Sequence, residues 1–249
     1  MSLIELSKYR LEVAKIKGKE GYWDTSEASV YLDGKLLLKV ERNYPFFPYA
    51  FLLDHPNTGH DYLICGSDYQ GLTVVNLSSG ERKDFLPTSA ARGMGFCHTA
   101  FKISPNRLLL SSIGCFWGGP YKGMVYEVSD PLSMPWECLF RTNGDVIKMS
   151  WDNDTCHFDT LMTVRSSDGK PYHELTDEEA DEDPEPDERE TCETFVFEER
   201  KRRLEKANLR RIAKEERLER LGYEKPTLSE RKKNLENIVA QRGWPKDEP

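Results

Sequence analysis

The chain has 249 residues, of which 38% are hydrophobic and 31% are charged, and it carries a formal net charge of −8. This length is enough for one large domain or two small ones. No stretch approaches the roughly 18 apolar residues of a membrane span, and residues 1–8 lack the apolar core of a signal peptide. We therefore expect no membrane association and a cytoplasmic location, or a nuclear one in a eukaryote.

The charge is distributed unevenly along the chain. Segment 174–190 holds eleven acidic residues and one basic residue, whereas residues 1–173 are nearly neutral and residues 191–249 are mildly basic. The like charges and two prolines predict a solvated linker, with a strap that folds onto a basic surface as the alternative. We expect an N-terminal segment (1–18), a β body (19–166), an acidic linker (167–192) and a charged helical tail (193–249).

Strand signals dominate the β body. Residues 29–32 and 36–40 are two extended runs separated by Asp33-Gly34, which is a strong signal for a hairpin turn. We expect further strands at the apolar runs 60–66, 72–77, 108–113 and 123–128. The six cysteines are scattered at 65, 97, 115, 138, 156 and 192, and we expect mostly buried thiols rather than a disulfide framework.

A weak internal repeat lies within the body, because residues 50–57 match residues 100–106 at a spacing of 50. The run 101–106, followed by a strand, resembles the signature of β-propeller blades of the WD40 and TolB kind. Residues 60–131 also resemble a little-characterised family of bacterial hypothetical proteins, through His60–Gly66, Asp68–Gly71, Gly114–Trp117 and Pro120-Tyr121. That family has no established activity, so the resemblance implies a fold only.

The fold class expected from these signals is mainly β. The body has room for three or four blades of about 40–50 residues, which predicts a small or incomplete propeller-like stack of antiparallel sheets. A C-terminal pair of α-helices should follow it. The first helix, 198–221, has two narrow apolar stripes and no single core face.

The second helix of the tail is better specified. Thr227 and Glu230 form a capping box, and Gly243 ends the helix. A single apolar stripe predicts that it docks on the chain itself or in a partner's groove. The docking residues would be Leu228, Leu235, Ile238, Val239 and Trp244.

Several side chains are of types that can bind metals or act in catalysis, but none belongs to a recognised catalytic motif. Cys97-His98 and Cys156-His157 lack the spacing of zinc ligands, and adjacent residues of a strand point to opposite faces, so we expect no metal and no cofactor. His55, His60, Asp61 and Asp68 could provide acid–base chemistry, but turn capping is the favoured interpretation. We therefore assign no catalytic residue.

The run 114–121 is the most unusual, because its glycines permit a tight turn and its aromatic side chains are large. These aromatics form either an exposed platform for a partner or a plug in the core, and the sequence leaves both open. The candidate ligand or partner surface comprises His60, Asp61, Asp68, Tyr69, His98, Phe116, Trp117 and Tyr121.

The favoured function is a non-enzymatic interaction or scaffold protein with a protein partner. The first alternative is a small hydrolase or ligand-binding enzyme that uses the His and Asp side chains in a cleft of the body. The second is association with nucleic acid through the basic tail. Glutamates interleaved at 198, 199, 205, 215, 216 and 219 weaken the positive field of that tail, which argues against this alternative.

Overall fold

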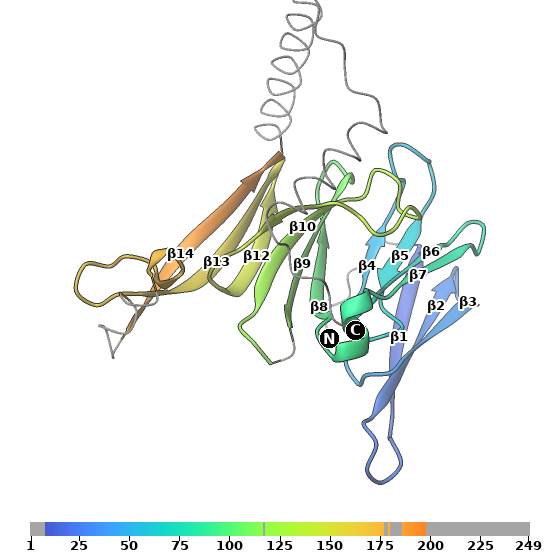
Figure 1. Ribbon diagram of the computed structural model, residues 1–249. Helices are drawn as coiled ribbons and strands as arrows, with labels where there is room; N and C mark the ends of the chain where they lie inside the picture. Colours follow the sequence, from blue (N-terminus) through green and yellow to red (C-terminus); the bar gives the residue numbers. More distant parts are fainter. Residues whose placement is uncertain (1–7, 117, 177–178, 180–185, 198–249) are drawn as a thin grey trace, which may run out of the picture. The chain divides into compact units, whose positions relative to one another are not determined.

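The computed structural model describes residues 8–116, 118–176, 179 and 186–197 (Figure 1). The chain divides into two units after Phe197, and the described residues all lie in the first unit. Trp117 and both expected helices of the tail therefore lie outside the described residues, as do the docking residues of the second helix. Within the described part of the chain, no helix is long and apolar enough to cross a membrane.

The described residues form four antiparallel sheets, so the expectation of a mainly β fold is confirmed. In each sheet the strands lie in chain order, and each strand pairs with the next. The first sheet contains β1 (Tyr9–Ile16), β2 (Thr25–Leu32) and β3 (Lys35–Arg42). The second contains β4 (Ala50–Leu52), β5 (Tyr62–Cys65), β6 (Leu72–Asn76) and β7 (Arg82–Phe85).

The third sheet contains β8 (Phe96–Ile103), β9 (Leu109–Phe116), β10 (Lys122–Glu127) and β11 (Cys138–Arg141). The fourth contains β12 (Asp145–Asp152), β13 (Thr155–Val164) and β14 (Asp187–Val196). Two short 3-10 helices, η1 (Thr88–Arg92) and η2 (Tyr172–Glu174), lie in connections. The repeat seen in the sequence falls on β4 and β8, the first strands of the second and third sheets.

The hairpin expected at Asp33-Gly34 is confirmed. Both turn residues have positive φ angles, 50° for Asp33 and 78° for Gly34, and they join β2 to β3. A two-residue turn of this handedness matches the right-handed twist of the strands that it connects. Asp tolerates the left-handed conformation better than most side chains, and Gly adopts it without a steric cost.

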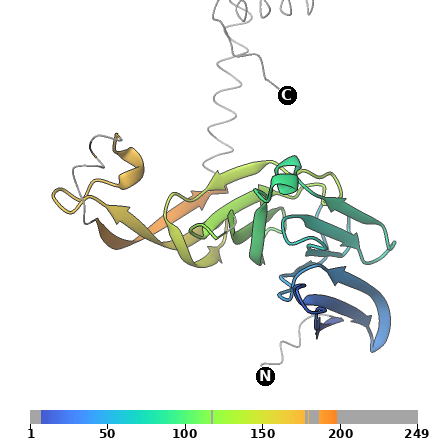
Figure 2. The same cartoon turned by 60° about the horizontal axis from the view of Figure 1, so that its bottom comes forward.

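Three apolar clusters hold the sheets in a row, and each cluster joins neighbours in chain order (Figures 1 and 2). Consecutive residues of β5 contribute to different clusters, since Leu63 packs toward the first sheet and Ile64 packs toward the third. In the same way, Leu109 of β9 packs toward the fourth sheet and Leu110 packs toward the second. The two-residue period of a strand thus explains why the inner sheets have apolar runs instead of alternation.

The outer faces of the two end sheets carry many charged and polar side chains. On the first sheet, Arg10 stacks on Tyr31 at 4.7 Å, and Lys39 forms an ion pair with Glu27 at 2.6 Å. On the fourth, His157 and Asp159 alternate with buried Cys156 and Phe158 and so face away from the third sheet. A polar face gains little from packing on a further sheet. The described residues accordingly form an open row of four sheets and no closed propeller.

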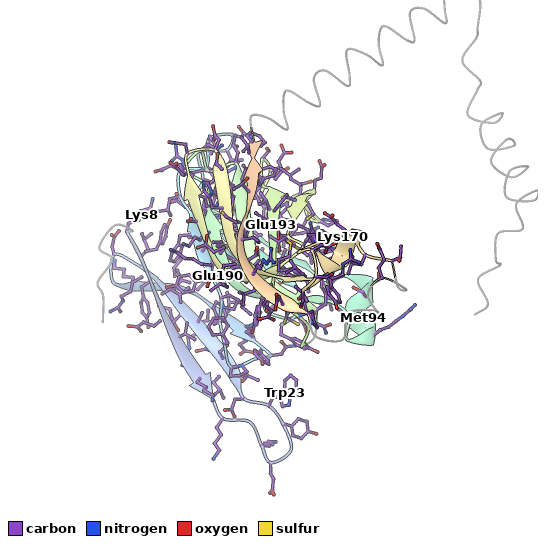
Figure 3. The ribbon with its side chains drawn as sticks, turned by 90° about the vertical axis from the view of Figure 1, so that its left-hand side faces the viewer. Lys8, Trp23, Met94, Lys170, Glu190 and Glu193 are labelled. Carbon is purple, nitrogen blue, oxygen red and sulfur yellow. The ribbon has the colours of Figure 1, made fainter. Side chains whose placement is uncertain are left out.

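One expectation about the acidic segment is wrong. Residues 187–196 form β14, which pairs with the whole of β13, whereas a linker to residue 192 and helical tail from 193 were expected. Backbone hydrogen bonds to β13 do not depend on side-chain charge, and the acids of β14 remain largely exposed. Glu193 also accepts hydrogen bonds from the backbone nitrogens of Asn143 and Gly144, at 2.9 and 2.8 Å (Figure 3 labels Glu193 and Glu190).

Candidate functional site

A cavity of about 330 Å³ lies where three sheets approach one another. Its walls come from the end of β3 and the residues after it, the β5–β6 loop, the start of β8, the end of β9 and the β9–β10 turn. Aromatic side chains dominate its rim, and a buried cation, a buried imidazole and two thiols line it. These residues are Tyr44, Phe46, Tyr69 and Tyr121, with Arg42, His98, Cys97 and Cys115.

Arg42 is the most unusual residue of this cavity. It is the last residue of β3 and only 3% exposed. Its Nη1 donates hydrogen bonds to the carbonyl oxygens of Gly66 at 2.7 Å and Asp68 at 2.9 Å. Its Nε has no hydrogen-bond partner in the described part of the chain, and no carboxylate there lies within ion-pair distance of the guanidinium. Burial lowers the pKa of Arg42, because the charged form is poorly solvated.

The β5–β6 loop is shaped around this guanidinium. A Cβ at Gly66 would lie 2.7 Å from Nη1 of Arg42 and 2.6 Å from the carbonyl oxygen of Gly71, so a larger residue does not fit. Asp68 accepts hydrogen bonds from Asn43 Nδ2 at 2.6 Å and from the backbone nitrogen of Gln70 at 2.8 Å. Both carboxylate oxygens of Asp68 are thus engaged in holding the loop.

The same loop presents Tyr69 at the rim. The backbone nitrogen of Tyr69 donates to Asn43 Oδ1 at 2.9 Å, which fixes the residue beside the end of β3. Its ring lies 5.9 Å from Tyr44 and 6.2 Å from Trp23, which belongs to the β1–β2 connection. Trp23 and Tyr44 are themselves 5.6 Å apart. The first and second sheets therefore build one aromatic edge, and Figure 3 shows Trp23 at the far end of the first sheet from Lys8.

His98 forms part of the inner wall. It is 5% exposed, its Nδ1 lies 2.7 Å from Ser112 Oγ, and its ring packs against Phe96 at 4.8 Å and Phe101 at 5.2 Å. Burial, and then the positive charge of Arg42, lower the pKa of His98 to about 3. The imidazole is therefore neutral near pH 7.

Cys97 and Cys115 are direct cross-strand neighbours on β8 and β9, so their side chains share one face, which lines the cavity. His98 is adjacent to Cys97 in the strand, and its stacking on Phe96 places it with the opposite face, as alternation requires. No group of three potential metal ligands comes together among the described residues.

The six cysteines are thiols in this structure. The expectation that they are mostly buried is wrong, because only Cys65 and Cys156 are buried. Cys97 and Cys115 are half-buried at the cavity, and Cys138 and Cys192 are exposed. The exposed pair lies on β11 and β14, where strand alternation turns these side chains away from the clusters.

Two aromatic candidates of the run 114–121 lie on different sides of the third sheet's end. Tyr121 is 44% exposed, lines the cavity and is fixed by a 2.7 Å hydrogen bond from its backbone nitrogen to Asp145 Oδ1. Phe116 is 39% exposed and lies with His98 on a smaller, apolar cavity of about 190 Å³ between the second and third sheets. The guanidinium of Arg141 covers the Phe116 ring at 4.7 Å.

The remaining candidates lie at the opposite end of the second sheet. His60 and Asp61 precede β5, whereas Asp68 and Tyr69 follow it. Asp61 accepts hydrogen bonds from Tyr9 Oη at 3.0 Å and from the backbone nitrogen of Asp54 at 2.8 Å, and it pairs with Lys8 at 2.8 Å. His60 Nδ1 lies 2.9 Å from Asn76 Nδ2.

His55 is also occupied by structural contacts. It is fully buried, and its two ring nitrogens lie 3.2 Å from Thr58 Oγ1 and 3.0 Å from the carbonyl oxygen of Val128. The structure thus brings Tyr69, His98 and Tyr121 to one cavity and places Asp68 beside it. It does not assemble His60, Asp61, Asp68 and His98 into one acid–base group.

Sequence reasoning missed Arg42, Tyr44 and Phe46. A signal for Arg42 was present, because Leu38, Val40 and Arg42 occupy alternate positions of β3 and therefore share a face. Val40 is 1% exposed, so the alternation places a charged residue on the buried side of the strand. Tyr44 and Phe46 lie after the strand, where no periodicity applies.

Comparison with known proteins gives one distant similarity to report. No family model matches this chain. The chain is 27% identical to an uncharacterized protein of Acanthamoeba polyphaga mimivirus over 140 residues, which are 55% of this chain and 53% of the viral protein. It therefore spans about half the length of that relative. The expected resemblance to a bacterial family is wrong, because the similarity found is to a viral protein. The viral relative has no stated activity, so this comparison assigns no activity to the chain.

Proposed function

We propose that this chain is a non-enzymatic interaction protein that captures a short segment of a partner in the cavity between its first three sheets. The observation that supports the proposal most strongly is the composition of that cavity. Aromatic side chains from three sheets surround a space of about 330 Å³, and a buried guanidinium and a neutral imidazole line it. Apolar walls with a few convergent polar groups are typical of binding sites.

The exposure of the rim agrees with this role. Phe46 is 51% exposed, Trp23 is 55% exposed and Tyr121 is 44% exposed, and these rings lie on or beside one cavity. Aromatic residues are enriched where interfaces derive most of their binding energy. We also regard the four sheets as four blades of an open, propeller-like scaffold, in which the cavity occupies the loop ends of neighbouring blades.

Affinity capture with matched variants tests this function. The full chain, a Tyr69→Ala/Tyr121→Ala variant and a Tyr31→Ala control on the outer face of the first sheet would be immobilised and exposed to the same native lysate. We expect a protein that the unchanged chain and the Tyr31→Ala control retain and the cavity variant loses. Equal retention by all three chains would contradict the proposal.

The hydrolase alternative receives no comparable support. His60 and Asp61 lie at one end of the second sheet, Asp68 lies at the other end, and His98 lies on β8 of the third sheet. Asp61 and Asp68 each accept structural hydrogen bonds. Docking by Leu228, Leu235, Ile238, Val239 and Trp244, and contact of the basic tail with nucleic acid, stay predictions about residues outside the described part of the chain.

A further inference from the structure

The buried guanidinium of Arg42 lacks a counter-ion in the described part of the chain. A charge that leaves water loses several kcal/mol of solvation, and proteins usually compensate with an ion pair and a full set of hydrogen bonds. Arg42 has only part of this compensation. Two backbone carbonyls occupy Nη1, while Nε is buried without an acceptor among the described residues.

The neighbouring carboxylates are engaged elsewhere. Asp68 is the nearest along the loop, and its two oxygens accept from Asn43 and from the backbone of Gln70. Asp84 accepts from Arg82 Nε at 2.8 Å and from Thr73 Oγ1 at 2.6 Å. Asp24, near the β1–β2 connection, pairs with Lys15 at 2.8 Å. The protein's own acids therefore leave the positive charge of Arg42 available to an anion that enters the cavity.

The other walls restrict what kind of anion fits. Tyr44, Phe46, Tyr69 and Tyr121 offer ring faces and edges, and His98 is part of the wall. A volume of about 330 Å³ is near the lower end of ligand pockets, which are about 300–1,000 Å³. It accommodates one large side chain with its adjoining backbone and not a long segment.

We infer that the cavity binds the C-terminal carboxylate of a partner chain whose last residue is aromatic. The carboxylate would pair with the guanidinium of Arg42, and the aromatic side chain would pack among Tyr44, Tyr69 and Tyr121. A guanidinium presents parallel N–H groups that match the two oxygens of a carboxylate. This inference rests on the proposed function, because it names the chemistry of the partner that the same cavity captures.

The test uses the full chain and two small probes that differ only in charge. N-acetylphenylalaninate carries the carboxylate and the ring, and N-acetylphenylalanine amide carries the ring alone. Binding of each would be measured by saturation-transfer NMR and by titration of tryptophan and tyrosine fluorescence. We expect the acid to bind about tenfold more tightly than the amide, or better, because hydrogen bonds to charged groups are the stronger kind.

Variants assign the effect to Arg42. Arg42→Lys should lose most of the preference for the acid, because a lysine cannot reproduce the paired N–H geometry. Arg10→Lys is the matched control on the outer face of the first sheet and should keep the preference. If Arg42→Lys fails to fold, the comparison of acid and amide on the unchanged protein still decides the matter. N-acetylaspartate amide, which has a side-chain carboxylate and no ring, should bind more weakly than N-acetylphenylalaninate.

The outcomes separate this inference from the proposed function. Equal binding of acid and amide would overturn the inference and leave the cavity as a binding site for aromatic groups. Absence of binding by either probe would also overturn it, while the capture experiment with Tyr69→Ala/Tyr121→Ala would still judge the function. Preference for N-acetylaspartate amide would show that an internal acidic side chain is recognised, which contradicts a C-terminal carboxylate.

Discussion

The two ends of β5 differ in how completely their polar groups are satisfied. At the end that precedes the strand, Asp61 has three partners and His55 has one for each ring nitrogen. At the end that follows it, Arg42 has no carboxylate partner in the described chain. His98 there has a described hydrogen bond at Nδ1 only. Polar groups that serve the fold find their partners within it, whereas incomplete pairing marks where a ligand can contribute.

The largest expected loss of stability comes from a change at the end of β5 that carries Asp61, where the polar groups have their partners. Asp61→Ala removes the acceptor of Tyr9 Oη, which is buried, and of the Asp54 backbone nitrogen, which is partly buried. We expect a loss of about 2–4 kcal/mol in the free energy of unfolding, measured with urea. His60→Ala, an exposed neighbour, should change it by less than about 1 kcal/mol. Equal losses of unfolding free energy in Asp61→Ala and His60→Ala would contradict the structural role given to Asp61.

The contribution of Asp61 to the stability of the fold should be lost only at low pH. Burial raises the pKa of Asp61, but hydrogen bonds from Lys8, Asp54 and Tyr9 outweigh it and hold the pKa below the ordinary 3.8. A carboxyl whose pKa is lower in the folded protein contributes stability above its unfolded pKa. That contribution is lost as the pH falls below about 4. The Asp61→Ala variant should lack this part of the acid sensitivity.

His98 should produce a second, separate dependence on pH. Its pKa is about 3 in the folded protein, while an unfolded imidazole titrates near 6.5. Between these values the unfolded chain binds one more proton, so stability falls as the pH is lowered through this window. We expect a loss of about 2–3 kcal/mol between pH 7 and pH 4.5. Urea unfolding of His98→Gln should show a flatter dependence, and an unchanged slope would contradict the assignment.

The sequence supported the larger features for identifiable reasons. Alternation and the Asp33-Gly34 turn predicted strands and a hairpin, and the repeat at 50 residues marked two similar sheets. The pairing of β14 was not predictable from local charge, because its stability comes from β13. At the cavity, Tyr69, His98 and Tyr121 were chosen for their residue types. Their convergence with Arg42 depends on contacts between residues far apart in sequence, which no local pattern encodes.

The rates at which the cysteines are alkylated should differ between the interior and the cavity. Burial raises the pKa of Cys65 and of Cys156 to about 12, so both thiols should resist iodoacetamide until the protein unfolds. Cys138 and Cys192 are exposed and should react first, and Cys97 and Cys115 should follow. Peptide mapping by mass spectrometry at successive times gives the order. Labelling of Cys65 as fast as Cys138 would contradict the described burial.

The smallest effect on stability is expected at the rim. Tyr121→Ala removes a ring that is 44% exposed and keeps the backbone hydrogen bond to Asp145. The free energy of unfolding should fall by less than about 1 kcal/mol. The same variant should bind N-acetylphenylalaninate about tenfold more weakly. A variant that is strongly destabilised and binds normally would assign this ring to the fold rather than to the site.

The NMR resonance of the Arg42 Nε–H group tests the central claim most directly. Addition of N-acetylphenylalaninate to the unchanged protein should shift this resonance, because a carboxylate paired with the guanidinium alters the environment of Nε. N-acetylphenylalanine amide should leave it nearly unchanged, and the resonance of Arg10, which stacks on Tyr31 on the outer face, should shift with neither probe. An Arg42 resonance that stays in place at a concentration of the acid that shifts others, or that shifts equally with the amide, would contradict the account.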